Sequence, residues 1–138
     1  MISNRDKKLF AHAMRVAELS ECKFRHGALI SLKGRVLGLG VNRDVFRPVE
    51  RFLGGHERNM AAEKRRARQE TTHAEVDAIF RVASKTGLNR VTLYSARVTK
   101  SGDPGNSYPC SSCQQIIKAV GVKRVVYFDG EGLAEWIP

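Results

Sequence analysis

The sequence has no long apolar run, since nowhere in its 138 residues do the roughly eighteen apolar residues of a transmembrane helix stand together. The opening stretch MISNRDKKLFAHAMRVAEL is charged and has neither the apolar core nor the cleavage site of a secretory signal. We therefore expect a cytoplasmic protein without membrane contact. Cysteine is scarce as well. Three cysteines, two of them in a C-x-x-C pair, favour metal binding or redox chemistry over a disulfide framework.

Acidic residues are outnumbered, because 24 Lys and Arg stand against 14 Asp and Glu and leave a net charge of +10. A charge of this size attracts phosphate-bearing partners, but it does not identify one. The alternative is a solvated basic surface that serves only solubility. The basic residues are dense in segment 43–68, where eight of them accompany four acidic ones.

Hydrophobic periodicity predicts alternating helices and strands. Apolar residues at helical spacing after a cap at Ser3 or Asn4 predict an opening helix. The alternation of apolar residues around the turn dipeptide Lys33-Gly34 predicts a β-hairpin over 27–42.

The rest of the chain continues the alternation. We expect a loop and a short basic helix over 43–70, a helix from His73 to about Ser84 with Val76, Ile79, Phe80 and Ala83 on its apolar face, a strand over 90–98, a helix carrying Ile116, Ile117 and Val120, and a strand over 124–128. The order α-β-β-α-β-α-β predicts a three-layer α/β/α sandwich with a mixed sheet. Residues 1–138 have the size of a single domain.

Two short motifs carry the chemistry, HAE at 73–75 and PCSSC at 109–113. His73, Cys110 and Cys113 are ligand types of a zinc site with three protein ligands, which leaves the fourth tetrahedral position open for catalysis. The two cysteines are three residues apart at an expected helix N-terminus, where they share a face and the dipole favours thiolates. Glu75 is then free to transfer protons without binding the metal.

Each motif alone is a weak signal. A C-x-x-C pair also occurs in redox proteins and as half of a structural zinc ribbon, and a lone histidine on a helix is usually an ordinary residue. A ribbon needs a second ligand pair, whereas the remaining cysteine, Cys22, is isolated, and we interpret it as a buried small apolar side chain. Together, H-x-E and P-C-x-x-C form the signature of zinc deaminases.

On these motifs the chain resembles the cytidine and deoxycytidylate deaminase superfamily. The likeness runs over nearly the whole chain and includes the opening helix, the hairpin with its glycine at 27, and GVN at 40–42. The resemblance implies an α/β/α fold and a zinc ion held by His73, Cys110 and Cys113. It also implies that Glu75 is the proton shuttle.

The resemblance further implies that Asn42 and the backbone of Ala74 contact the substrate. Tyr108 is a third candidate for substrate binding, and it departs from the family pattern. Many members have glutamate before the proline and cysteine, and polynucleotide deaminases have serine there. Gln114 also stands where typical deoxycytidylate and tRNA adenosine deaminases have alanine.

The implied reaction is hydrolysis of a cytosine base to uracil, with water activated by zinc and protons carried by Glu75. A free nucleotide such as dCMP is the first candidate substrate, because it is the usual substrate of small family members. The second is a polynucleotide, either cytosine in single-stranded nucleic acid or adenosine in tRNA. Segment 43–68 would hold such a strand, with Phe46, Phe52 and Tyr108 for stacking. A binding module without chemistry is weakest, since it has no use for Glu75. Relatives usually assemble, so we expect a homo-oligomer.

Overall fold

The structure is a computed structural model that describes residues 1–43, 72–83 and 87–138. Its elements, in chain order, are α1 (Asn4–Ala17), β1 (Arg25–Leu32), β2 (Arg35–Val41), α4 (Ala74–Ala83), β3 (Thr92–Val98), α5 (Ser111–Val120), β4 (Arg124–Phe128) and β5 (Leu133–Trp136). The loop and basic helix expected over 43–70 lie outside the described residues, apart from Arg43. No helix in the described ranges could cross a bilayer, because none is both long and apolar enough.

The five strands form one mixed sheet in the order β2-β1-β3-β4-β5. β1 pairs antiparallel with β2 and β3, while β3 and β4 run parallel. Because parallel neighbours need a crossover connection, α5 lies between β3 and β4 in the sequence. The predicted mixed sheet is confirmed, with one addition. β5, which pairs antiparallel with β4, was not predicted, because LAEW is too short to show a strand pattern.

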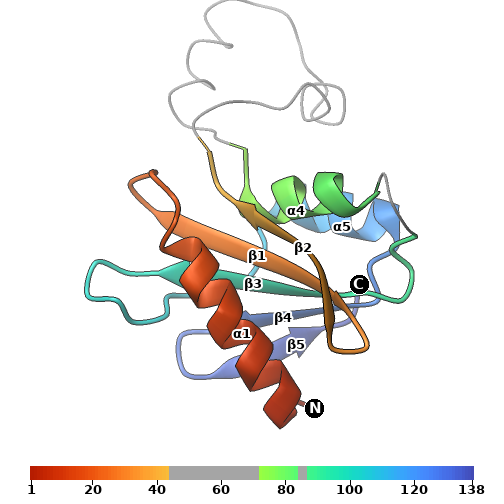
Figure 1. Cartoon of the computed structure of the whole chain (residues 1–138), viewed down its shortest axis with the longest axis horizontal. Helices are drawn as coiled ribbons and strands as arrows, with labels where there is room; N and C mark the ends of the chain where they lie inside the picture. Colours follow the sequence, from red (N-terminus) through yellow and green to blue (C-terminus); the bar gives the residue numbers. More distant parts are fainter. Residues whose placement is uncertain (44–71, 84–86) are drawn as a thin grey trace, which may run out of the picture.

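Helices cover both faces of the sheet, which confirms the predicted three layers (Figure 1). On one face, Leu9 and Phe10 of α1 join the same apolar cluster as Leu29 and Tyr94 of the sheet. On the other face, α4 and α5 enclose the larger cluster. Its members from these two helices include Val76, Ile79, Val82, Cys113 and Ile117.

Two local signals in the sequence place α1 and the hairpin. Ser3 caps α1 as predicted, because its hydroxyl accepts a hydrogen bond from the Asp6 N–H, and the Asp6 carboxylate accepts one from the Ser3 N–H. Lys33 and Gly34 both have positive φ, 50° and 86°. Two such residues make the tight turn whose twist suits a β-hairpin, as the dipeptide predicts.

The apolar face of α4 differs from the prediction. Val76 and Ile79 are buried as expected, but Phe80 and Ala83 are exposed, and Val82 is buried instead. The cause is the close packing of α4 on β2, where the Val82 side chain fills the space above Gly38. The contact with Gly38 thus favours the burial of Val82, and helical spacing alone does not reveal such a contact.

Candidate metal centre and active site

The start of α4 is tied to the end of β2. Thr72 and Arg43 exchange two backbone hydrogen bonds of 2.8 and 2.9 Å, and the Asp77 carboxylate accepts one from the Val41 N–H. His73, immediately before the helix, accepts the first helical hydrogen bond from the Asp77 N–H. These contacts fix where His73 and Glu75 stand relative to the sheet.

Gly40 allows α4 to approach β2 this closely. A Cβ atom at Gly40 would lie 2.4 Å from the Ala74 carbonyl oxygen and 2.5 Å from the Ala78 nitrogen. Both contacts are with backbone, so a side chain could be accommodated only by moving the first turn of α4. Ala74, a predicted substrate contact through its backbone, is fully buried under this packing.

Cys110 and Cys113 stand at the other helix end. Cys110 is the N-cap residue of α5, and Cys113 lies in the first turn. The segment leading to them is fastened to β3 by two reciprocal hydrogen bonds, from the Ser95 hydroxyl to the Ser107 carbonyl and from the Ser107 hydroxyl to the Ser95 carbonyl. At 2.9 and 2.6 Å, both bonds are buried.

The structure brings His73, Cys110 and Cys113 together. Nδ1 of His73 lies 3.2 Å from the Cys113 sulfur and 3.5 Å from the Cys110 sulfur, and all three ligand atoms lie within 4.8 Å of one another. A tetrahedral zinc ion with bonds of about 2.3 Å to sulfur and 2.0 Å to nitrogen separates such ligands by about 3.5 Å. The nitrogen–sulfur distances fit zinc, so this group is positioned to bind the metal.

The electrostatics at the cysteines suit metal binding too. A hydrogen bond with Cys113, and then one with His73, lowers the pKa of Cys110 to about 3. The thiolate is the form of cysteine that binds metals. The same contacts would therefore prepare Cys110 as a ligand at neutral pH.

Glu75 lies next to this group and is only 5% exposed. Burial is the main cause that raises the pKa of its carboxyl, and the positive field of His73 and a hydrogen bond with Cys113 partly oppose the rise. A raised pKa brings a carboxyl closer to the pH range in which it can both accept and release a proton. The structure thus places a buried acid with a raised pKa beside the three ligand-type residues.

Asn42, a predicted substrate contact, is 7% exposed and is bound within the protein. Its Oδ1 accepts hydrogen bonds from the Ser20 hydroxyl and the His26 N–H, at 2.5 and 2.9 Å. Its Nδ2 donates to the Phe24 carbonyl at 2.6 Å. The side chain thus holds the segment before β1 against the end of β2.

Cys22 is half-buried, and its thiol donates to the Asn42 carbonyl at 3.4 Å. The interpretation of Cys22 as a buried small apolar side chain is wrong, because the residue is only half-buried and its sulfur takes part in a hydrogen bond. Tyr108, the third candidate for substrate binding, is 43% exposed. Its ring centroid lies 4.9 Å from that of Tyr127 and 5.9 Å from that of Trp136, so the ring leans toward β4 and β5.

The motifs did not indicate two basic residues, one of which, His26, lies close enough to the metal group for the charges of His73 and Cys110 to act on its pKa. His26 and Arg97 are directly opposite each other in the pairing of β1 and β3. Burial, followed by the charges of Arg97 and His73, lowers the pKa of His26 to about 4. The sequence holds no signal for this pair, because the two residues become neighbours only through the strand register.

The sequence model of one family, described as the cytidine and deoxycytidylate deaminase zinc-binding region, matches residues 3–129. No protein with a curated description matches the chain. Among solved structures, a cytidine deaminase from Burkholderia pseudomallei has 18% sequence identity and a TM-score of 0.62, with 95% of this chain and 91% of that chain covered. The dCMP deaminase of the cyanophage S-TIM5, in complex with dCMP and dUMP, has 18% identity and a TM-score of 0.60, with 91% and 81% covered. At such identities these two structures show a shared fold.

Proposed function

Because the chain belongs to the family of the cytidine and deoxycytidylate deaminase zinc-binding region, we propose that it hydrolyses the amino group of a free cytosine nucleotide such as dCMP. Membership confirms the resemblance carried by the two motifs. It makes the chain a zinc-binding, hydrolytic deaminase of cytosine nucleotides or nucleosides. Our proposal adds the nucleotide itself and the role of each site residue.

One observation carries the proposal, namely that residues from two distant motifs meet at one point. His73 comes from the start of α4, and Cys110 and Cys113 come from the start of α5, yet their ligand atoms lie within 4.8 Å. A buried carboxyl, Glu75, forms a hydrogen bond with one of these ligands. A structural zinc site would need a fourth ligand and no buried acid, so this arrangement favours catalysis.

The roles of the residues follow from their chemistry. His73, Cys110 and Cys113 would hold zinc, which when bound supplies a water activated as a nucleophile near neutral pH. Glu75 would accept a first proton from the attacking water and pass it to N3 of the cytosine. It would then accept the second proton from the oxygen now bonded to C4 and deliver it to the amino group, which leaves as ammonia. Cytosine and water are thereby converted to uracil and ammonia.

Residues around the metal ligands would bind the rest of the substrate. We propose that the backbone of Ala74, at the start of α4, hydrogen-bonds the base, and that Asn42 uses its remaining Nδ2 hydrogen toward the substrate. The exposed Tyr108 would border the entrance. In the described structure Asn42 also holds the preceding loop, so its replacement would disturb both binding and the local fold.

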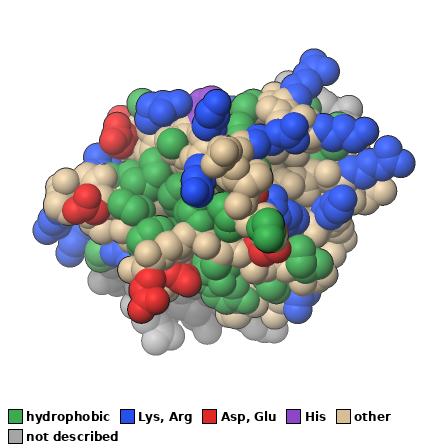
Figure 2. Space-filling model, turned by 90° about the horizontal axis from the view of Figure 1, so that it is seen from below, with side chains coloured by type: hydrophobic (Ala, Val, Ile, Leu, Met, Phe, Trp, Pro, Cys, Tyr) green, Lys and Arg blue, Asp and Glu red, His purple; other side chains and the backbone are tan. Residues whose placement is uncertain are grey.

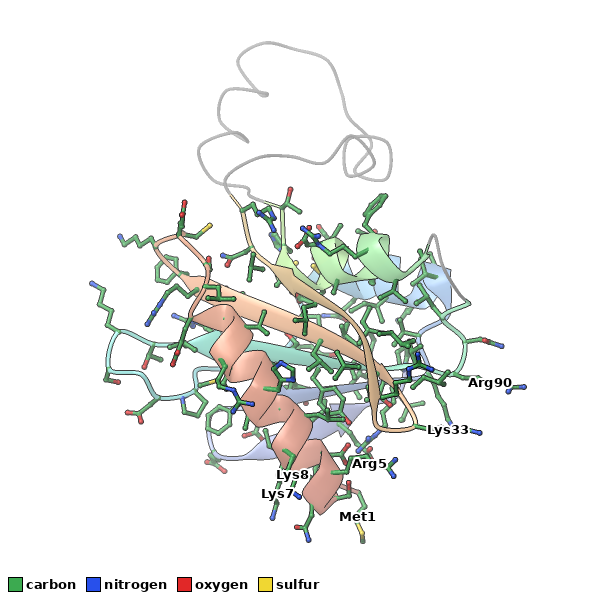
Figure 3. The ribbon with its side chains drawn as sticks, in the orientation of Figure 1. Met1, Arg5, Lys7, Lys8, Lys33 and Arg90 are labelled. Carbon is green, nitrogen blue, oxygen red and sulfur yellow. The ribbon has the colours of Figure 1, made fainter. Side chains whose placement is uncertain are left out.

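The choice of a free nucleotide over a polynucleotide rests on the family description, which names deoxycytidylate, and on where the described cations lie. Figure 3 shows Arg5, Lys7, Lys8 and Lys33 at the end of the molecule where α1 begins and the hairpin turns. β1 runs from His26 near the metal group to Leu32 beside that turn, which is about 20 Å at 3.3 Å per residue. These cations are therefore too far from the site to contact a nucleotide bound there.

The other Lys and Arg side chains of the described residues do not mark a binding path for a polynucleotide either. Figure 2 shows Lys and Arg side chains scattered over the face seen from below, more of them in its upper and right-hand parts, with hydrophobic side chains between them near the centre. Segment 43–68, which we predicted to hold a strand, lies outside the described residues except for Arg43. A polynucleotide substrate stays as the second candidate on the strength of that segment's charge alone.

The test is ammonia release from dCMP, deoxycytidine, single-stranded DNA and tRNA by the purified, zinc-loaded protein. We expect dCMP to be the best of the four substrates by kcat/KM. Faster turnover of DNA or tRNA would replace the nucleotide by the polynucleotide. No ammonia from any cytosine substrate, in a protein shown to contain zinc, would contradict the proposed function.

Two further predictions concern the whole chain. We propose that residues 1–138 form one domain, which is supported by one continuous sheet and a family match over 3–129. We also propose that the protein is a homo-oligomer. A single cooperative unfolding transition and a mass above that of one chain in light scattering are the expected results.

A further inference from the structure

Arg97 has a buried nitrogen without a hydrogen-bond partner. Its Nε is inaccessible to solvent and forms no hydrogen bond, and it is the one such side-chain atom in the described parts of the chain. Buried polar atoms in native proteins are nearly always paired, so an unpaired one calls for an explanation. An arginine is charged at every accessible pH, which makes the missing partner more costly.

The other arginines near this end of the sheet do have oxygen partners. Arg43 and Arg81 form ion pairs with Asp77, and Arg25 donates to the Thr99 carbonyl at 3.2 Å. Arg97 takes part in none of the ion pairs among residues 1–43, 72–83 and 87–138. Its guanidinium carbon lies 5.3 Å from the centroid of the Phe24 ring, a contact that satisfies the charge in part but accepts no hydrogen bond in the guanidinium plane.

The strand register places Arg97 opposite a residue that lies near the proposed active site. Side chains alternate along β3, so Arg97 shares the face of Ser95, the face that carries α4 and α5. Its cross-strand neighbour is His26, whose pKa responds to the charges of His73 and Cys110. The Gly105 N–H donates to the Arg97 carbonyl, and from there the chain leads to the cysteine ligands.

We propose that Arg97 binds the phosphate group of the substrate nucleotide. The inference rests on the proposed function, since the base must be held at the metal group for its phosphate to reach the strand end. Arginine presents a planar fork of N–H donors that matches phosphate oxygens, and such charge-assisted bonds are strong. Nε itself is closed to solvent, so the phosphate would bond to the terminal nitrogens of the guanidinium. It would supply the anion that the described residues do not provide to this side chain.

The matched variants are Arg97→Met, Arg97→Lys and, as the control, Arg25→Met. Met keeps the length of the side chain and removes its charge, whereas Lys keeps the charge without the fork. We expect Arg97→Met to lower kcat/KM for dCMP about 10- to 100-fold more than for deoxycytidine, mainly through KM, because a charge-assisted hydrogen bond is lost. Arg97→Lys should retain part of the preference for dCMP over deoxycytidine, and Arg25→Met should leave that preference unchanged.

A second measurement needs no turnover. Calorimetry with the product pair dUMP and deoxyuridine should show tighter binding of dUMP by wild type, and Arg97→Met should remove that difference. A dinucleotide with a 5′-phosphodiester distinguishes the source of the phosphate. If Arg97→Met lowers kcat/KM for this dinucleotide as much as for dCMP, the subsite binds the phosphate of a strand as well as that of a free nucleotide. Our assignment to the free nucleotide is then overturned.

The outcomes separate this inference from the function on which it rests. If wild type deaminates deoxycytidine as well as dCMP and binds dUMP no better than deoxyuridine, the phosphate subsite is wrong while the deaminase stands. Equal losses for dCMP and deoxycytidine in Arg97→Met would make Arg97 a structural residue. If no cytosine compound is turned over, the proposed function fails, and the calorimetry still decides whether Arg97 binds phosphate.

Discussion

Asp6 and Glu75 are buried acids in the first turns of α1 and α4, at opposite ends of the sheet (Figure 1). Asp6 is surrounded by donors. Arg124 donates two hydrogen bonds to it, of 2.8 and 2.9 Å, and the Tyr94 hydroxyl donates one of 2.6 Å. The Ser3 N–H adds a fourth. Arg124 is the main cause that holds the pKa of Asp6 well below its ordinary value.

Glu75 has no arginine among the causes that act on its pKa, so burial dominates and raises that pKa. Both side chains are shielded from solvent, yet their pKa values move in opposite directions, because donors surround Asp6 whereas burial dominates at Glu75. The carboxylate of Asp6 therefore stays ionised at neutral pH, whereas the raised pKa of Glu75 suits the proton transfer that we propose for it. The comparison predicts that replacing Asp6 affects stability and replacing Glu75 affects turnover.

The largest expected effect is on catalysis. Glu75→Gln keeps the size of the side chain but cannot shuttle a proton, so we expect kcat to fall by about 10²- to 10⁴-fold. Zinc content and the unfolding midpoint should stay close to wild type. Glu131→Gln, at an exposed glutamate, is the matched control and should change none of the three. Turnover of Glu75→Gln at the wild-type rate would remove Glu75 from the mechanism.

Removing a metal ligand should be nearly as severe. Cys113→Ala deletes one of three ligands, so the zinc content should fall well below about one ion per chain, and activity should fall with it. Metal analysis of the purified variant, beside Cys22→Ala as a cysteine control, measures the effect. Wild-type zinc content and affinity in Cys113→Ala would exclude Cys113 from the site.

At the other end of the sheet the effect should be on stability. Arg124→Met leaves the buried Asp6 without its main partner and should lower the free energy of unfolding by about 3 kcal/mol. Urea unfolding measures this as a lower midpoint at unchanged slope. The double variant Asp6→Leu with Arg124→Met should lose less than the sum of the two single variants, because no charge is then left unpaired. Additive losses would show that the two side chains are not coupled.

The smallest effect is a dependence on pH. Because the pKa of Asp6 is lower in the folded than in the unfolded state, its ionised form stabilises the fold above about pH 4. That contribution is lost as the pH falls through the range below the unfolded value. Between about pH 5 and pH 3 the unfolding free energy of wild type should thus fall more steeply than that of Asp6→Asn. Parallel curves would contradict the shift.

Much of the site could be predicted because its residues are adjacent in the sequence. His73 and Glu75 are two residues apart, Cys110 and Cys113 three apart, and each pair starts a helix whose apolar spacing is visible. By contrast, Asp6 and Arg124 are 118 residues apart and meet only when the sheet forms.

Strand register and close packing explain the other features that the sequence did not predict. The pairing of His26 with Arg97 depends on how β1 aligns with β3, which no local pattern specifies. The buried face of α4 was partly wrong because glycines in β2 let the helix approach on one side. β5 is only four residues long and is defined by its partner strand more than by its own sequence.

The bridge between Arg43 and Thr72 has a consequence for how this protein can change over evolution. Its two hydrogen bonds fasten the points where segment 44–71 leaves and rejoins the sheet, one residue before His73. Both bonds join main-chain atoms, so they do not require particular side chains at positions 43 and 72. A sequence change in segment 44–71 would therefore reach His73 only by moving this bridge, and the bridge separates the sequence history of the segment from that of the metal group.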